Sequence, residues 1–148
     1  MKKNIYYWII AIIALGVIAG GVGYLMYNKP HPDYTQMQPE KVLSVEDLYS
    51  AFTSSVPKAN ALYTGKVIQV SGNVDHVETL DSTSIVVFVL GEGLFGDEGV
   101  RCTFQSDYAN ESDGLVSGSN ISVKGYCTGY NETDVILEHC VLIDASDK

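Results

Sequence analysis

The distribution of apolar and polar residues changes twice along this chain, and each part predicts a different kind of element. Residues 5–27 form an unbroken run without a charged side chain. Over residues 45–56 the apolar positions recur at spacings of three and four, and from residue 66 they recur every second residue. Helices repeat every 3.6 residues and strands every two. The pattern therefore predicts an apolar helix, then an amphipathic helix, then a β-domain.

The uncharged run from Ile5 to Tyr27 has the length of a membrane-spanning helix. It contains 23 residues, and about 20 apolar residues in a helix cross the hydrocarbon core of a bilayer. Two lysines precede the run and a single lysine follows it closely. The positive-inside rule then predicts that residues 1–4 are cytoplasmic. We expect a single-pass membrane protein whose remaining chain lies outside, in the periplasm or the extracellular space.

A cleaved signal peptide is the alternative interpretation of the same run. Val17, Ile18 and Ala19 before Gly20 resemble a small-residue cleavage site. The apolar run continues past that site to Tyr27, which favours an uncleaved anchor. Both interpretations export the domain that follows.

Residues 28–43 are predicted to be a linker, and residues 44–148 to be the exported domain. Three prolines interrupt the linker, and proline-rich segments are semi-extended spacers. We expect the residues from Asn28 to Glu40 to hold the domain about 30 to 40 Å from the membrane.

The domain is predicted to begin with a helix and to continue with strands. Ser44 followed by Asp47 resembles an N-terminal cap, and Pro57 should end the helix near Ser55. Gly72 is predicted to be a bulge or bend in a long first strand. The predicted strands are 66–77, 84–90, 100–105, 120–129 and 134–143, with a short helix at 107–111 between the third and fourth.

This order of elements predicts a mainly β fold, a five-stranded OB-fold barrel with a leading α-helix. Three strands, a helical insertion and two further strands are the order of the OB-fold. A β-sandwich is the alternative, but it commonly needs seven strands.

Six segments of the domain resemble one known family. They are VEDLY (45–49), ANALYTGKV (59–67), VSGNV (70–74), VRCTF (100–104), VKGYCTG (123–129) and VILEHCVL (135–142). Together they look like the tRNA_anti-like OB-fold proteins over residues 44–143. The resemblance implies an OB-fold, a location at the cell envelope behind an anchor or lipoprotein signal and, by analogy of fold alone, nucleic-acid binding.

The charge of the domain weighs against nucleic acid as its partner. From Ser44 onward, 16 Asp and Glu residues face five Lys and Arg, a net charge of −11. Binding to phosphate backbones requires clustered cations, and an acidic surface repels them. No stripe of exposed aromatic residues alternates with Lys or Arg, as single-strand binding requires. We expect the partner to be an envelope protein or a small ligand.

No motif for enzymatic chemistry is present in the sequence. GxSxG, HExxH, P-loop and paired Cys–His signatures are absent. His76 and His139 are the only histidines of the domain, and they lack the spacing of a metal site. We therefore expect no enzymatic activity, no cofactor and no metal.

Three cysteines, Cys102, Cys127 and Cys140, fall on predicted strands. Folding the last hairpin about Thr133 brings Cys127 near Cys140, so these two are the candidate disulfide in an oxidising compartment. The alternative is three buried thiols that act as small apolar side chains.

The predicted function is a non-enzymatic, membrane-anchored, extracytoplasmic OB-fold binding module. Its candidate binding rim is the loop 92–99, with Glu92, Phe95, Asp97 and Glu98. One alternative is an envelope carrier or chaperone resembling the haem chaperone of cytochrome c maturation, although residues 144–148 lack the His and Tyr of that family's haem segment. The other alternative is an OB domain that binds oligosaccharides or nucleic acids.

Overall fold

The computed structural model describes residues 2–27, 34, 36–81, 83–94, 96–105, 107–112 and 114–143. The chain divides into two compact units, residues 1–32 and residues 33–148. Each unit is described by itself.

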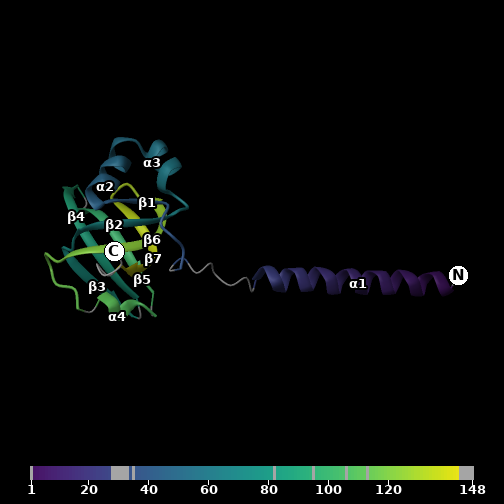
Figure 1. The fold of residues 1–148 in the computed structure, drawn as a ribbon. Helices are drawn as coiled ribbons and strands as arrows, with labels where there is room; N and C mark the ends of the chain where they lie inside the picture. The colour runs from purple at the N-terminus through teal and green to yellow at the C-terminus, as the bar shows by residue number, and fades with distance from the viewer. Residues whose placement is uncertain are drawn as a thin grey trace. The chain divides into compact units, whose positions relative to one another are not determined.

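The first unit contains a single helix, α1 (Lys2–Tyr27) (Figure 1). Within it, the 22 residues from Tyr6 to Tyr27 are long and apolar enough to cross a membrane. The predicted apolar helix is thus present, with a length and composition that membrane anchors and signal sequences share.

The second unit is one seven-stranded sheet with three short helices (Figure 1). The strands follow the order β1-β2-β6-β7-β5-β4-β3. All neighbouring pairs are antiparallel except β1 with β2 and β5 with β7, which are parallel. The elements are β1 (Lys41–Ser44), α2 (Val45–Ser54), α3 (Val56–Tyr63), β2 (Val67–Asn73), β3 (His76–Leu80), β4 (Thr83–Gly93), β5 (Gly96–Phe104), α4 (Ala109–Ser112), β6 (Asn120–Tyr130) and β7 (Asp134–Leu142).

The mainly β class is confirmed, but the strand count differs from the five that were predicted. The predicted first strand, 66–77, is two strands, because the chain changes its hydrogen-bond partners between them. Val74 donates its N–H to Ser119 on the β6 side, and Asp75 donates to Val87 of β4. The hydrogen-bonded order ends at β1 and β3, so the sheet is not closed by hydrogen bonds into the predicted barrel.

Strand β1 lies inside the segment that the sequence assigns to the linker. Its residues pair in parallel with β2, from Lys41 opposite Ile68 to Ser44 opposite Ser71. Glu40 already donates its N–H to Val67, 2.9 Å away. Four residues after a proline-rich stretch give no period-two signal, because the strand is too short to show alternation.

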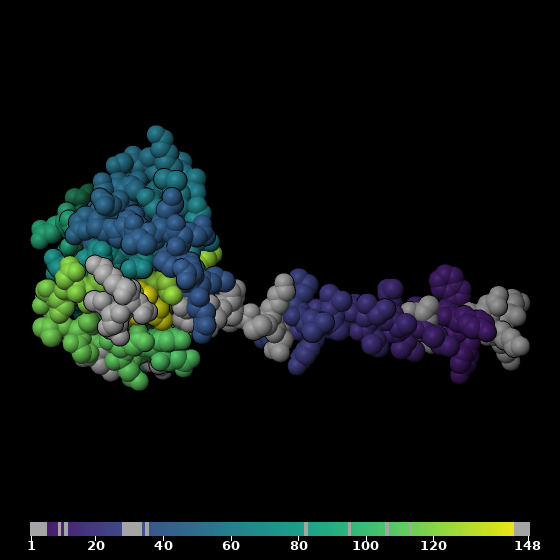
Figure 2. All heavy atoms as spheres, in the orientation of Figure 1, coloured from purple at the N-terminus to yellow at the C-terminus, as the bar shows by residue number. Residues whose placement is uncertain are grey.

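Helix α2 forms as its sequence predicts. The hydroxyl of Ser44 accepts the N–H of Asp47 at 3.0 Å, which satisfies one of the free donors of the first turn. Its apolar stripe is turned into the core, where Val45, Leu48 and Phe52 are buried. Helix α3 follows at once with a proline in its first turn. Figure 2 shows the atoms of α2 and α3 gathered over one end of the second unit.

Gly72 allows α2 to pack closely on the sheet, and it does not form the predicted bulge. It pairs in regular register with Ile121 of β6. A Cβ atom at this position would overlap the side chain of Val45, and it would lie 3.4 Å from the ring of Phe88. The absence of a side chain at Gly72 therefore lets α2 approach the sheet and cover the core.

Candidate functional site

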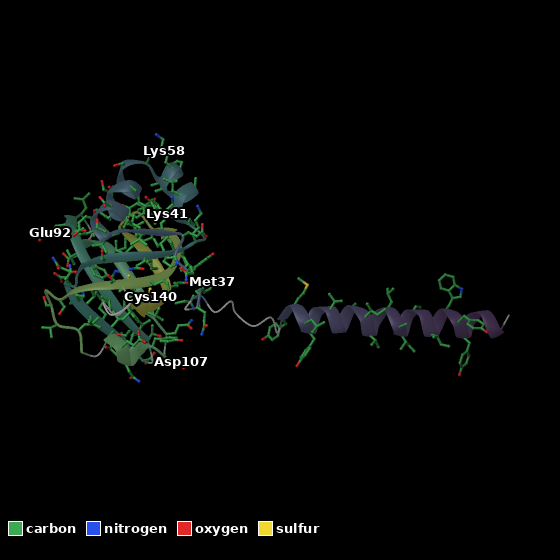
Figure 3. All side chains as sticks on the ribbon, in the orientation of Figure 1. Met37, Lys41, Lys58, Glu92, Asp107 and Cys140 are labelled. Carbon is green, nitrogen blue, oxygen red and sulfur yellow. The ribbon has the colours of Figure 1, made fainter. Side chains whose placement is uncertain are left out.

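The predicted binding loop 92–99 is the end of a long hairpin formed by β4 and β5. Glu92 lies opposite Asp97, and Gly93 lies opposite Gly96. Both Glu92 and Asp97 are exposed, and Figure 3 shows Glu92 at the margin of the domain. Phe95, the remaining residue predicted at the turn, lies outside the described residues. The other three predicted rim residues, Glu92, Asp97 and Glu98, thus lie on two paired strands next to the turn.

Among the described residues of the second unit, Leu94 at the hairpin turn is the most exposed large apolar one, with 98% of its surface accessible. Sequence reasoning did not single it out, although it stands between two glycines and near three carboxylates. We use the name hairpin tip for Glu92, Leu94 and Asp97. This surface combines one apolar side chain with two exposed negative charges.

Glu98 differs from the other predicted rim residues because it connects the hairpin to α2. The hydroxyl of Tyr49 donates to Oε2 of Glu98 at 2.6 Å. Burial, followed by this hydrogen bond, raises the pKa of Tyr49 well above its usual value. The Glu98 side chain also occupies the space beside Gly93, where a Cβ atom would overlap it. Glu98 is therefore a structural residue that holds the hairpin in place.

Aromatic rings pack behind this connection. Tyr130 contacts Tyr49 edge to face at 6.5 Å between ring centroids, and it stacks on Phe52 at 5.8 Å. Such pairs contribute about 0.5–1.5 kcal/mol beyond their burial. The base of the hairpin therefore rests on a rigid support formed by α2 and β6.

An ion-pair network crosses the outer surface of β3, β5 and β7. Arg101 donates from Nη1 to Oε2 of Glu78 at 2.9 Å and from Nε to Oδ2 of Asp134 at 3.1 Å. The other oxygen of Asp134 accepts the N–H of Gly99 at 3.1 Å. Asp134 is 8% exposed, so these donors offset the cost of burying its carboxylate. The guanidinium of Arg101 is thereby matched by two carboxylates.

His76 extends this network on β3. Its Nδ1 lies 2.8 Å from Asp75 and its Nε2 lies 3.2 Å from Oε1 of Glu78. The hydrogen bond to Asp75 is the main cause that raises the pKa of His76. The hydrogen bond from His76 in turn is the main cause that lowers the pKa of Glu78. In the described part of the chain, no group of three or more His, Cys, Asp or Glu residues is arranged to hold a metal ion.

A second aromatic group lies on β6 and β7. Tyr34 stacks on Tyr126 at 4.5 Å between ring centroids, with 29° between the planes. The ring of His139 lies 5.0 Å from Tyr34. His139 has a left-handed backbone, φ 53°, within the register shift of β7 against β6. This contact could not be predicted from local patterns, because Tyr34 lies in the segment predicted as a linker.

The three cysteines are buried free thiols. Cys127 lies opposite Leu137 in register, whereas the Cys140 sulfur is the atom that a Cβ at Gly125 would meet first. Burial raises the pKa of Cys127 to about 11. Burial also raises the pKa of Cys140, whose thiol lies within hydrogen-bonding reach of Cys102 and of the Thr103 backbone. The predicted pair Cys127 and Cys140 is therefore offset along the hairpin, and Cys140 is turned toward β5.

Comparison with known proteins bears on the fold and the family. The model of the tRNA_anti-like family matches residues 1–141. Among 41 matching chains of solved structures, one from Klebsiella pneumoniae is described as a "putative nucleic acid-binding lipoprotein". It has a TM-score of 0.56 and 21% identity, over 78% of this chain and 100% of that chain. At that identity the likeness shows the fold alone. No curated protein matches the sequence.

Proposed function

The chain belongs to the tRNA_anti-like family, and on that premise we propose that it is a membrane-anchored binding module outside the cytoplasm. The module is non-enzymatic, and its ligand is an envelope protein or a small molecule. It binds through an OB-type barrel and not through a phosphate-recognition surface.

The topology supports an OB-type barrel with one divided strand. Only Val74 and Asp75 separate β2 from β3, yet β2 pairs with β6 and β3 pairs with β4. If β2 and β3 are counted as one bent strand, this strand pairs with β6 at one end and with β4 at the other. Together with β4, β5, β6 and β7 it then makes five strands around a core. The remaining strands then have the OB order, in which β4 and β5 correspond to the second and third strands. That pair provides the face on which OB-folds bind oligonucleotides and oligosaccharides.

One observation favours a ligand other than nucleic acid, namely the pairing of Arg101. Arg101 is the only Lys or Arg on β3, β4, β5 and β7. Its guanidinium bonds to two carboxylates, those of Glu78 at 2.9 Å and of Asp134 at 3.1 Å. A phosphate at this face would have to displace Glu78 and Asp134. Nucleic-acid affinity grows with the number of phosphates that cations neutralise, so this surface offers little of it.

Nucleic-acid binding is the second candidate, and the description of the Klebsiella protein is what favours it. The word lipoprotein in the same description supports an envelope location for this chain as well. The two lysines at the start of α1, before its uncharged run, support an outward orientation of the domain. The net charge of −11 from Ser44 onward opposes the nucleic-acid part of the analogy.

The hairpin tip is the surface that we assign to partner binding. Leu94 is exposed, and the carboxylates of Glu92 and Asp97 lie on either side of the turn. An exposed apolar side chain between acidic residues is complementary to an apolar pocket bordered by Lys or Arg. The structural bond between Tyr49 and Glu98 fixes the hairpin, which lowers the entropic cost of binding.

Site-specific photo-crosslinking from the full chain in its native membrane tests this assignment. A crosslinking residue at Leu94 is compared with one at Leu80 of β3, which is also exposed, at 68%. Leu80 pairs with Thr83 at the start of β4, the end opposite to the hairpin tip. We expect a discrete protein adduct from position 94 only. Replacing Glu92 and Asp97 by lysine should abolish it. Equal adducts from both positions, or adducts to nucleic acid, would contradict the proposal.

A further inference from the structure

Three buried thiols meet in the core around one residue of β7. Cys102 on β5 and Cys127 on β6 are both register partners of Leu137. Cys140 lies farther along β7, and all three cysteines are 0% exposed. Figure 3 labels Cys140 among the side chains of the second unit. The three sulfur atoms are therefore close enough for their pairing to depend on the direction of each side chain.

The bulge in β7 directs Cys140 toward β5. Residues 124 and 126 of β6 pair with 141 and 138 of β7, so β7 has one extra residue in this interval. His139 has a left-handed backbone conformation there, and its ring lies against the ring of Tyr34 on the outer surface. Cys140 is thereby turned inward, where its thiol lies within hydrogen-bonding reach of Cys102 and of the Thr103 backbone.

Cys127 has hydrogen-bond partners of its own. Its thiol lies within hydrogen-bonding reach of the Thr64 side chain and of the Gly129 backbone, and it also lies near Cys102. Its register partner on β7 is Leu137, three residues before Cys140. Cys102 and Cys140 are consequently the two thiols that face each other across the neighbouring strands β5 and β7.

We propose that Cys102 and Cys140 form a disulfide, and that Cys127 stays a free thiol. The two thiols lose two protons and two electrons as the S–S bond forms. The oxidant is the disulfide of a thiol–disulfide oxidoreductase, or oxidised glutathione in vitro, and it is reduced to two thiols. The bond connects β5 to β7 and encloses α4 and β6.

Because these thiols are buried in the folded domain, we expect them to be oxidised during folding. Thiolates are the attacking species in disulfide exchange, and burial keeps the Cys140 thiol protonated in the folded domain. Oxidised glutathione should therefore act on the chain while it refolds and act slowly on the folded, reduced domain.

Peptide mapping distinguishes the pairings because of where the basic residues lie. Trypsin cleaves after Arg101 and Lys124, so Cys102 falls in peptide 102–124, whereas Cys127 and Cys140 share peptide 125–148. The full chain is refolded in detergent with oxidised glutathione, alkylated in denaturant, digested and analysed by mass spectrometry. We expect peptides 102–124 and 125–148 to be joined, with one alkylated cysteine. A second protease that cleaves after Glu132 assigns the bond to Cys140.

A matched set of variants completes the test. Cys127→Ser should keep the joined peptides, and Cys140→Ser should lose them. A loop confined to peptide 125–148 would show that Cys127 pairs with Cys140 and would overturn the proposal. Three alkylated cysteines after oxidative refolding of the unsubstituted chain would overturn it as well, and that result does not depend on any variant folding.

Discussion

The ring of Tyr34 stacks on the ring of Tyr126 at 4.5 Å between centroids. This contact attaches the chain before β1 to the outer surface of β6. Tyr34 also accepts the N–H of Met37 through its carbonyl at 3.3 Å, so a turn continues from the stacked residue toward β1.

Replacing Tyr34 by alanine should release this segment without unfolding the domain. An aromatic pair contributes about 0.5–1.5 kcal/mol, and Tyr34 lies outside the core cluster. We expect faster tryptic cleavage after Lys41, which is exposed on the edge strand β1. Limited proteolysis followed by mass spectrometry measures the rate. Tyr34→Phe keeps the ring and should cleave like the unsubstituted protein; equal rates for all three proteins would exclude the docked segment.

Removing the charge of Arg101 should destabilise the domain more than removing that of Glu78. Arg101→Gln leaves Asp134 buried without its cationic partner, and we expect a loss of about 1–3 kcal/mol. The Glu78 side chain is 42% exposed, and Glu78→Gln should cost less than about 1 kcal/mol. Urea unfolding of each variant measures the difference. Equal losses of stability in both variants would show that the bond between Arg101 and Asp134 contributes no more than the bond between Arg101 and Glu78.

The stability of the domain should fall slightly as the pH rises through the titration of His76. Its hydrogen bonds to Asp75 and Glu78 favour the charged imidazolium and raise its pKa. This contribution is complete below the unfolded-state pKa of about 6.5 and is lost as the pH rises through the higher folded-state pKa. The side chain is 41% exposed, so the effect is below about 1 kcal/mol.

Urea unfolding at pH 6 and pH 8.5 measures this contribution, with His76→Gln as the control. The variant carries no titrating group at this position, so its stability should change less between the two pH values. An identical pH dependence of both proteins would mean that the ion pairs of His76 are not formed in solution.

Gly72→Ala should separate α2 from the sheet. The added methyl group overlaps the side chain of Val45, and overpacking of this kind costs about 1–3 kcal/mol. Val45→Ala removes the overlapping atoms, so the double variant should recover part of the loss that the two single variants predict by addition. Thermal unfolding of the four proteins measures the coupling. Strict additivity would contradict the close contact.

The sequence predicted those parts of the fold that local signals encode. The stripe of Val45, Leu48 and Phe52 became the buried face of α2, and Ser44 became its cap. The apolar runs of β4, β6 and β7 also appear where alternation indicated them. These features depend on periodicity and on hydrogen bonds within a few residues, which a sequence displays directly.

The remaining features depend on contacts between distant segments. The break at Val74 exists because β6 and β4 compete for the same strand. The direction of Cys140 follows from a bulge that only the pairing with β6 defines. The role of Glu98 follows from its bond with Tyr49, 49 positions earlier. Local patterns contain no record of such partners, so the sequence did not distinguish the structural residue Glu98 from the exposed residues Glu92 and Asp97.

The most direct measurement of the central claim is the binding of single-stranded RNA to the full chain in lipid nanodiscs at low salt. Fluorescence anisotropy of a labelled oligonucleotide reports the complex, with an established single-strand-binding OB protein as the positive control. Our account predicts no change in anisotropy up to about 100 µM protein, the weak end of non-specific nucleic-acid binding. Saturable binding whose affinity falls steeply with added salt would contradict it and would identify the domain as a nucleic-acid binder.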